Sequence, residues 1–163
     1  MTKVLYGNDA IKEVERKEGP LNNVERYIVK HEGYVKGEYL DTKGIRTRGV
    51  GQTGKWLTKS FTETFQHHEF ECAKLIPMYP LLEENVRMAL MSLMYRGDLQ
   101  QSPKFRKLFN EGDILAACEE LLDHKEYLDN ETPQGIKRRL REAYDYIRSS
   151  FMCNMRGHNA VRR

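Results

Sequence analysis

The sequence predicts an α+β fold that is mainly α-helical, with a small antiparallel β lobe set among helices and followed by a helical lobe. Over most of the chain, apolar residues recur at helical spacing between capping residues. Over residues 34–57, recurring glycines and alternating apolar residues replace that pattern. A chain of 163 residues, of which 39% are hydrophobic, can form the core of one globular domain but not of two.

The first element is a short charged helix over residues 8–18. Ile11 and Val14 lie on one face of it, and Gly19 ends it. Few apolar residues are present in this segment, so we expect it to be an appendage. We therefore assign residues 1–21 to an N-terminal helical extension.

The second helix begins after Asn22, because an asparagine followed three residues later by Glu25 is typical of a capping box. Gly33 ends this helix. Glu32 therefore lies in the last turn, where the helix dipole disfavours a negative charge.

A small antiparallel sheet with tight turns is predicted over residues 34–57. Val35, Tyr39, Ile45 and Val50 supply the alternating apolar positions. Glycines supply the turns, at positions 37, 44, 49, 51 and 54.

The rest of the chain is predicted to be helical. Four capping signals begin helices here: Ser60 with Glu63, Ser102-Pro103, Asp113 and Thr132-Pro133. A further apolar helix runs from Leu82 to Met94. We assign the main domain to residues 22–150 and expect residues 151–163 to form a basic, flexible tail.

Charge and cysteine content limit the function classes. The net charge is only +3, although the first 60 residues carry 12 basic and 8 acidic groups and could meet a polyanion such as a nucleic acid or a bacterial cell wall. Cys72, Cys118 and Cys153 are widely spaced and odd in number, which argues against a disulfide framework. No apolar stretch approaches the ~20 residues that a membrane span needs, and the N-terminal residues lack the apolar run of a signal peptide.

Glu32 and Asp41 are candidates for acid–base chemistry at the junction of a helix and a sheet. Cleavage of a glycosidic bond needs one protonated carboxyl and one ionised carboxylate. We expect Glu32 to favour the protonated form at the helix end, and Asp41 to stay ionised near Lys43 and Arg46. From the residues alone, Glu32 could equally be a solvated residue at a helix end, and Asp41 an ordinary turn residue.

This segment resembles the catalytic signature of the phage-type lysozymes, the endolysin family of the T-even and lambdoid phages. The family pattern is E-G followed by D-x-x-G-x-x-T-x-G-x-G-x-T-G. The matching residues are Glu32, Gly33, Asp41, Gly44, Thr47, Gly49, Gly51, Thr53 and Gly54. A looser resemblance extends over roughly residues 22–148.

The resemblance implies a two-lobed lysozyme-like fold, with residues 22–150 as the catalytic domain. It implies hydrolysis of the β-1,4 bond between N-acetylmuramic acid and N-acetylglucosamine in peptidoglycan, with inversion and without cofactor or metal. Glu32 would be the general acid, Asp41 would orient or activate water, and Thr47 would help to place that water. The substrate-binding residues that it implies are Gln52, Thr53, Tyr95 and Arg139.

Gln52 stands where the family usually has histidine, and Tyr95 stands in an altered turn. We expect a monomeric endolysin that is made in the host cytoplasm and released by a holin to the periplasm and cell wall. Its expected partner is peptidoglycan. We expect neither nucleic-acid binding nor stable membrane insertion. A virion-associated lysozyme that opens the wall during entry is the first alternative. A catalytically silent peptidoglycan-binding or interaction protein on the same fold is the second.

Overall fold

A computed structural model describes the backbone of residues 3–161 and the side chains of residues 3–153. The chain separates into two compact units, residues 1–70 and residues 71–163. Most elements are helices, and a small antiparallel sheet lies in the first unit, so the predicted α+β, mainly α class is confirmed. In the part of the chain searched, no helix is long and apolar enough to cross a membrane.

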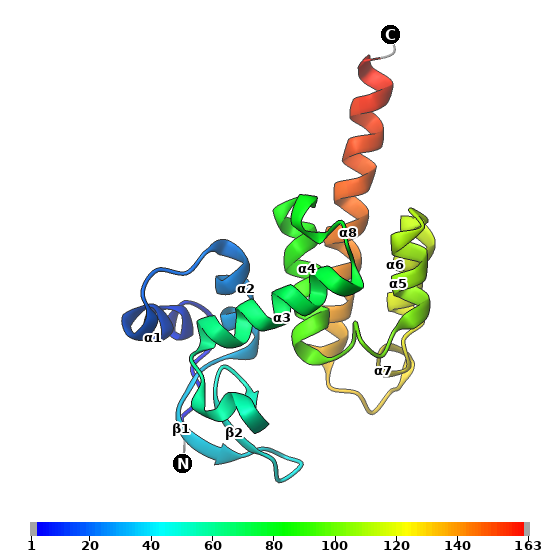
Figure 1. Cartoon of the computed structure of the whole chain (residues 1–163). Coiled ribbons are helices and arrows are strands. Elements are labelled where there is room, and N and C mark those ends of the chain that lie inside the picture. The colour runs from blue at the N-terminus through cyan, green and yellow to red at the C-terminus, as the bar shows by residue number, and fades with distance from the viewer. Residues whose placement is uncertain (1–2, 162–163) are drawn as a thin grey trace. The chain divides into compact units, whose positions relative to one another are not determined.

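The first unit holds the sheet and the helices around it (Figure 1). Its elements are α1 (Gly7–Glu18), α2 (Asn23–Glu32), β1 (Val35–Leu40), β2 (Arg46–Gly49), β3 (Gln52–Thr53), the 3-10 helix η1 (Gly54–Thr58) and the first part of α3 (Phe61–Leu75). The sheet has the order β1-β2-β3 and both pairings are antiparallel, as the glycine pattern predicts. The expected sheet segment ends earlier than predicted, because η1 begins at Gly54.

Capping side chains fix both ends of α2. The Asn22 side chain accepts a hydrogen bond from the Glu25 N–H at 2.9 Å, and the Glu25 carboxylate accepts one from the Asn22 N–H at 3.1 Å. Gly33 ends the helix at φ 78°, a conformation that only glycine adopts at little cost. The predicted capping box and stop are both confirmed, so the end of α2 at Glu32 is well defined.

The expected N-terminal appendage is instead an integral part of the first unit. Ala10 and Val14 of α1 are buried, and α1 packs against α2. The Glu18 carboxylate accepts hydrogen bonds from the N–H groups of Phe61 and Thr62 at 2.9 and 2.7 Å, and so caps the start of α3. The sequence prediction was wrong here because an acidic side chain that caps a helix distant in the chain leaves no local pattern.

Burial raises the pKa of the Glu25 carboxyl; the Asn22 N–H opposes this rise, and the negative charges of Glu69 and Glu18 add to it. A pKa that is higher in the folded state means that stability is greatest below the ordinary pKa of glutamate and declines as the pH rises through the folded-state value. Glu25→Gln should therefore raise the free energy of unfolding at neutral pH, because glutamine keeps the capping bond without the charge.

Urea unfolding of the two proteins at neutral pH and at about pH 3 measures this difference. We expect the advantage of Glu25→Gln to disappear at the acidic pH, where the native carboxyl is already protonated. A variant that is less stable than the native protein at neutral pH would show that the carboxylate stabilises the fold.

The second unit is helical. It contains the end of α3, the 3-10 helix η2 (Tyr79–Leu81), α4 (Glu84–Arg96), α5 (Pro103–Asn110), α6 (Ile114–Leu122), α7 (Lys125–Leu128) and α8 (Gln134–Val161). The long helix α8, orange to red in Figure 1, packs against α4 and α6 and buries Leu140, Ala143 and Ile147. The expected helix end near Ser150 is wrong, because α8 continues to Val161. Residues 162–163 of the predicted tail lie outside the described residues, and its flexibility stays a prediction.

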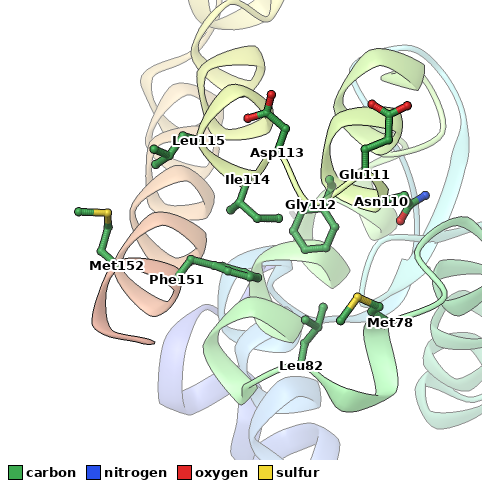
Figure 2. A pocket seen from close by; sticks show the side chains of 11 residues that line it. Met78, Leu82, Asn110, Glu111, Gly112, Asp113, Ile114, Leu115, Phe151 and Met152 are labelled. Atoms are coloured by element: carbon green, nitrogen blue, oxygen red, sulfur yellow. The ribbon is translucent and has the colours of Figure 1, made fainter. Parts of the chain in front are cut away.

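An apolar pocket of about 560 Å³ lies within the second unit. Figure 2 shows Met78 and Leu82 facing the turn between α5 and α6, with Phe151 and Met152 of α8 beside it. Its lining includes none of the predicted site residues. The pocket is therefore a feature separate from the proposed chemistry.

None of the three cysteines is in a disulfide bond. Cys72 and Cys118 are buried and Cys153 is exposed. Burial, followed by the neighbouring Glu119, raises the pKa of the Cys118 thiol to about 12, so this thiol stays protonated.

Candidate active site

Glu32 is the last residue of α2 and its side chain is half-buried. The chain turns sharply at Gly33 and then enters the sheet, so the carboxylate is held at the junction of α2 and β1. A Cβ atom placed on Gly51, in the turn between β2 and β3, would lie 3.5 Å from Oε2 of Glu32. The acid therefore lies against the backbone of this turn, and the absence of a side chain at Gly51 leaves room beside it.

Asp41 follows β1 directly and organises the turn that leads to β2. Its Oδ1 accepts hydrogen bonds from the N–H groups of Lys43 and Ile45, both at 2.8 Å. Its own N–H donates to the Ile45 carbonyl at 3.0 Å. The two bonds to Oδ1 hold the carboxylate, and the third joins the two ends of the turn; no ion pair to Asp41 occurs among the residues that the structure describes. Oδ2 is left for a water molecule or a substrate.

Thr47 lies in the middle of the sheet and is 4% exposed. It pairs with Tyr39 of β1 and with Thr53 of β3. Its hydroxyl donates to the Ile45 carbonyl at 3.0 Å, so the remaining lone pairs of Oγ1 can accept a hydrogen bond. The hydroxyl is thereby oriented as a fixed acceptor, joined through Ile45 to the turn that holds Asp41.

Arg46 does not lie against Asp41 as expected. Its guanidinium donates to both carboxylate oxygens of Glu38, at 2.7 and 2.9 Å, across the β1–β2 pair. The guanidinium therefore pairs with Glu38, two positions along β1 from its direct cross-strand neighbour Leu40, and not with Asp41. An effect of Arg46 on Asp41 stays a prediction. The turn N–H groups, not the arginine, contact Asp41.

Gln52 is buried at the start of β3, with 4% of its surface exposed. Its amide nitrogen lies within hydrogen-bond distance of the carbonyls of Trp56 (3.2 Å) and Lys59 (2.8 Å) and of the Thr64 hydroxyl (3.0 Å). Its Oε1 accepts from the Val50 N–H at 3.4 Å. A single side chain thus joins the β2–β3 turn to η1 and α3, so a positioning role fits Gln52 better than direct contact with a substrate.

Replacing Gln52 by alanine should lower the free energy of unfolding by about 2 kcal/mol, because buried polar groups lose their partners. Lytic activity should fall as well, since the turn that Gln52 holds also contacts Glu32. Chemical denaturation and cell-clearing rates measure the two effects. Gln66→Ala, at an exposed position on α3, is the matched control. Equal stability of the Gln52→Ala and Gln66→Ala proteins would contradict the role of Gln52 as a central hydrogen-bonding residue.

Tyr39 is a site residue that the sequence analysis missed. Burial raises the pKa of its hydroxyl, and the electrostatic effects of Tyr6, Asp41 and Glu32 raise it further. The phenol therefore stays protonated at neutral pH and can donate a hydrogen bond. Its position in the sequence could have indicated it, because Tyr39 lies near the end of β1, two residues before Asp41.

Trp56 and Thr53 of the first unit make contacts within the fold. Trp56 packs against His67 and His68, with ring centroids 4.7 and 5.7 Å away, and Lys55 lies over its ring. No group of three or more potential metal ligands occurs among the described residues. Thr53 precedes η1 without a side-chain capping bond and pairs with Thr47 in the sheet.

Tyr95 and Arg139 belong to the second unit. Tyr95 lies near the end of α4, and Arg139 of α8 donates a hydrogen bond to the Ser92 hydroxyl of α4 at 3.0 Å. Both side chains are half-buried. The structure thus gathers Glu32, Asp41, Thr47, Gln52 and Thr53 in the first unit and places the other two predicted residues in the second.

Two comparisons with known proteins found a match for this chain. The family model for phage lysozymes matches residues 29–143, a stretch that contains every predicted site residue. The chain is similar to the crystal structure of the active form of the P1 phage endolysin Lyz, with a TM-score of 0.65 and 14% sequence identity over 91% of this chain and 97% of that one. At this identity the likeness shows the fold alone. A search of curated proteins found no match.

Proposed function

This chain belongs to the phage lysozyme family, a family of glycosidases, and from that premise we propose that it cleaves the β-1,4 bond between N-acetylmuramic acid and N-acetylglucosamine in peptidoglycan. The observation that supports the proposal best is local to the first unit. Glu32 ends α2 against the turn at Gly51, in the same unit as the fixed carboxylate of Asp41 and the oriented hydroxyl of Thr47.

In the proposed reaction, Glu32 is the general acid. It donates its proton to the glycosidic oxygen, so that the leaving sugar departs as a neutral alcohol. The turn backbone at Gly51 gives the carboxyl a fixed position without a covering side chain. A rigid helix end suits this role, because a general acid must hold its proton within hydrogen-bond distance of the leaving oxygen.

Asp41 orients and activates the attacking water in this proposal. Two N–H groups hold Oδ1, while Oδ2 can accept a proton from water. Thr47 accepts a second hydrogen bond from the same water, since its own proton is donated to the Ile45 carbonyl. Attack by water on the anomeric carbon, opposite the departing oxygen, inverts that centre.

The hydrogen bonds of Gln52 weaken the alternative of a catalytically silent protein. A neutral amide replaces the usual histidine of the family, yet its nitrogen has three acceptors within hydrogen-bond distance. Its oxygen accepts a hydrogen bond from Val50 in the β2–β3 turn. The departure from the family pattern therefore preserves the scaffold beneath Glu32. We propose an active enzyme, with Gln52 and Thr53 supporting the sheet and with Tyr95 and Arg139 binding substrate.

In the phage cycle, we propose that the protein is an endolysin that acts on the wall at the end of infection, as a monomer released by a holin. Expression in intact host cells should then cause lysis only when the inner membrane is permeabilised. Immunodetection in purified virions tests the alternative of an entry enzyme. A positive signal there would overturn the endolysin assignment in favour of that alternative.

The enzymatic proposal is tested by adding the purified protein to outer-membrane-permeabilised cells and by a peptidoglycan zymogram. We expect the turbidity to fall and a cleared band to form. A folded protein that clears neither substrate would contradict the proposal and favour a wall-binding role.

A further inference from the structure

The N-terminal segment crosses the chain immediately after Glu32. Leu5 and Tyr34 form an antiparallel bridge, in which the Leu5 N–H donates to the Tyr34 carbonyl at 2.9 Å and the Tyr34 N–H donates to the Leu5 carbonyl at 2.8 Å. Two backbone hydrogen bonds thus fix residue 5 beside residue 34. The following side chain, that of Tyr6, is consequently held close to the end of α2.

The Tyr6 ring lies directly on Gly33. A Cβ atom at Gly33 would lie 2.8 Å from Cε1 and 3.0 Å from Cδ1 of this ring, and 2.8 Å from the Leu5 carbonyl oxygen. Such distances leave no room for any side chain, so Gly33 is required here by this contact as well as by its positive φ. The ring therefore packs on the residue that adjoins Glu32.

Neither helix capping nor burial accounts for a tyrosine at position 6. The residue is the N-cap of α1, where Ser, Thr, Asp or Asn is preferred, and its side chain makes no capping hydrogen bond. Its surface is 61% exposed, although an aromatic ring of this size usually contributes to stability by being buried. A single exposed aromatic residue is ordinary on a protein surface, but the Tyr6 ring is also fixed against Gly33, the residue that follows Glu32.

The surroundings of the ring match the chemistry of a sugar. A pyranose ring presents C–H groups on its faces and hydroxyl groups at its rim, so it stacks on an aromatic face while its rim accepts and donates hydrogen bonds. The Tyr6 ring contacts Gly33, the residue that follows Glu32, and Tyr6, Asp41 and Glu32 all act electrostatically on the Tyr39 hydroxyl. An aromatic surface with polar groups on one side can bind an N-acetylhexosamine ring.

We propose that Tyr6 is a sugar-binding residue of the active site, on which an N-acetylhexosamine ring of the glycan strand stacks beside Glu32. The proposal rests on the proposed muramidase function. It assigns to the N-terminal segment, residues 3–18, a direct part in holding the substrate. It also explains why Gly33 and the Leu5–Tyr34 bridge occur together with Tyr6, because both fix the ring in place.

The test compares Tyr6→Ala and Tyr6→Phe, assayed with soluble, un-cross-linked glycan strands. Loss of one aromatic contact should raise KM about five-fold for Tyr6→Ala, while kcat stays within about two-fold. Tyr6→Phe keeps the aromatic face and should stay within about two-fold of the native KM. Phe70→Ala is the matched control, because Phe70 is an aromatic residue with 62% of its surface exposed, and it should leave both constants unchanged.

A parallel measurement separates this proposal from the proposed function. Calorimetric titration of a tetrasaccharide of alternating N-acetylglucosamine and N-acetylmuramic acid into Glu32→Gln, with and without Tyr6→Ala, measures binding without hydrolysis. We expect Kd to rise about five-fold when Tyr6 is absent. An inactive native protein would overturn the muramidase proposal, whereas this titration would still decide the role of Tyr6.

Two results would overturn the inference. An unchanged KM and Kd in Tyr6→Ala would show that the ring does not contact the glycan. A Tyr6→Phe protein as weak as Tyr6→Ala would show that the hydroxyl, and not the aromatic face, is what matters. If Tyr6→Ala does not fold, Tyr6→Leu decides the question in the same way, because leucine covers Gly33 without offering an aromatic face.

Discussion

Glu32→Gln is expected to reduce the rate of peptidoglycan hydrolysis by roughly 100- to 10,000-fold, the range that general acid catalysis contributes. Glutamine has the shape of glutamate, so the contact with the turn at Gly51 should be kept. The amide cannot donate a proton to the leaving oxygen as a carboxylic acid does. Turbidity loss of permeabilised cells and the zymogram both report this change.

Glu38→Gln is the matched control for this substitution. Glu38 is also a glutamate of the first unit, but its carboxylate pairs with Arg46 on the surface of the sheet. An exposed pair of this kind contributes little stability, so activity should stay within about two-fold of the native value. If Glu32→Gln cleared cells as fast as Glu38→Gln, Glu32 would not be the general acid.

Asp41→Asn should have the second-largest effect, a decrease of about 100-fold in kcat with a small change in KM. The asparagine oxygen can still accept the two N–H bonds that Oδ1 receives, so the turn between β1 and β2 should persist. What disappears is the negative charge that takes the proton of the attacking water. Steady-state kinetics with soluble glycan strands separate kcat from KM.

Asp129→Asn is the matched control, and it tests whether replacing any aspartate in a turn by asparagine lowers the activity. Asp129 accepts an N–H bond from Glu131 at 2.9 Å in a comparable turn of the second unit. It should tolerate asparagine without loss of activity. Equal activity of Asp41→Asn and Asp129→Asn would mean that Asp41 serves only the turn, as the sequence alone also allowed.

Local signals predicted much of the fold. The capping boxes at Asn22 and Ser60 rest on contacts three residues apart, and the structure contains both. The glycine-rich segment predicted an antiparallel sheet because tight turns need glycine at positive φ, as at Gly49 and Gly51. Spacing likewise identified Glu32 and Asp41, since their family pattern lies within one continuous segment.

Contacts between distant residues could not be predicted in this way. The bonds from Glu18 to the start of α3 join residues more than 40 positions apart. The packing of Tyr6 on Gly33 depends on the bridge between Leu5 and Tyr34, which has no sequence signature. The same reason explains why Gln52 could be read as substrate-binding, because its partner Thr64 lies on a different element.

Identification of the new reducing ends tests most directly whether this chain is a muramidase. Purified peptidoglycan is digested with the protein, reduced with borohydride and examined by mass spectrometry. We expect reduced N-acetylmuramic acid at the new ends, formed by the native protein and not by Glu32→Gln. Reduced N-acetylglucosamine, or non-reducing anhydro-muramic ends, would contradict the muramidase proposal.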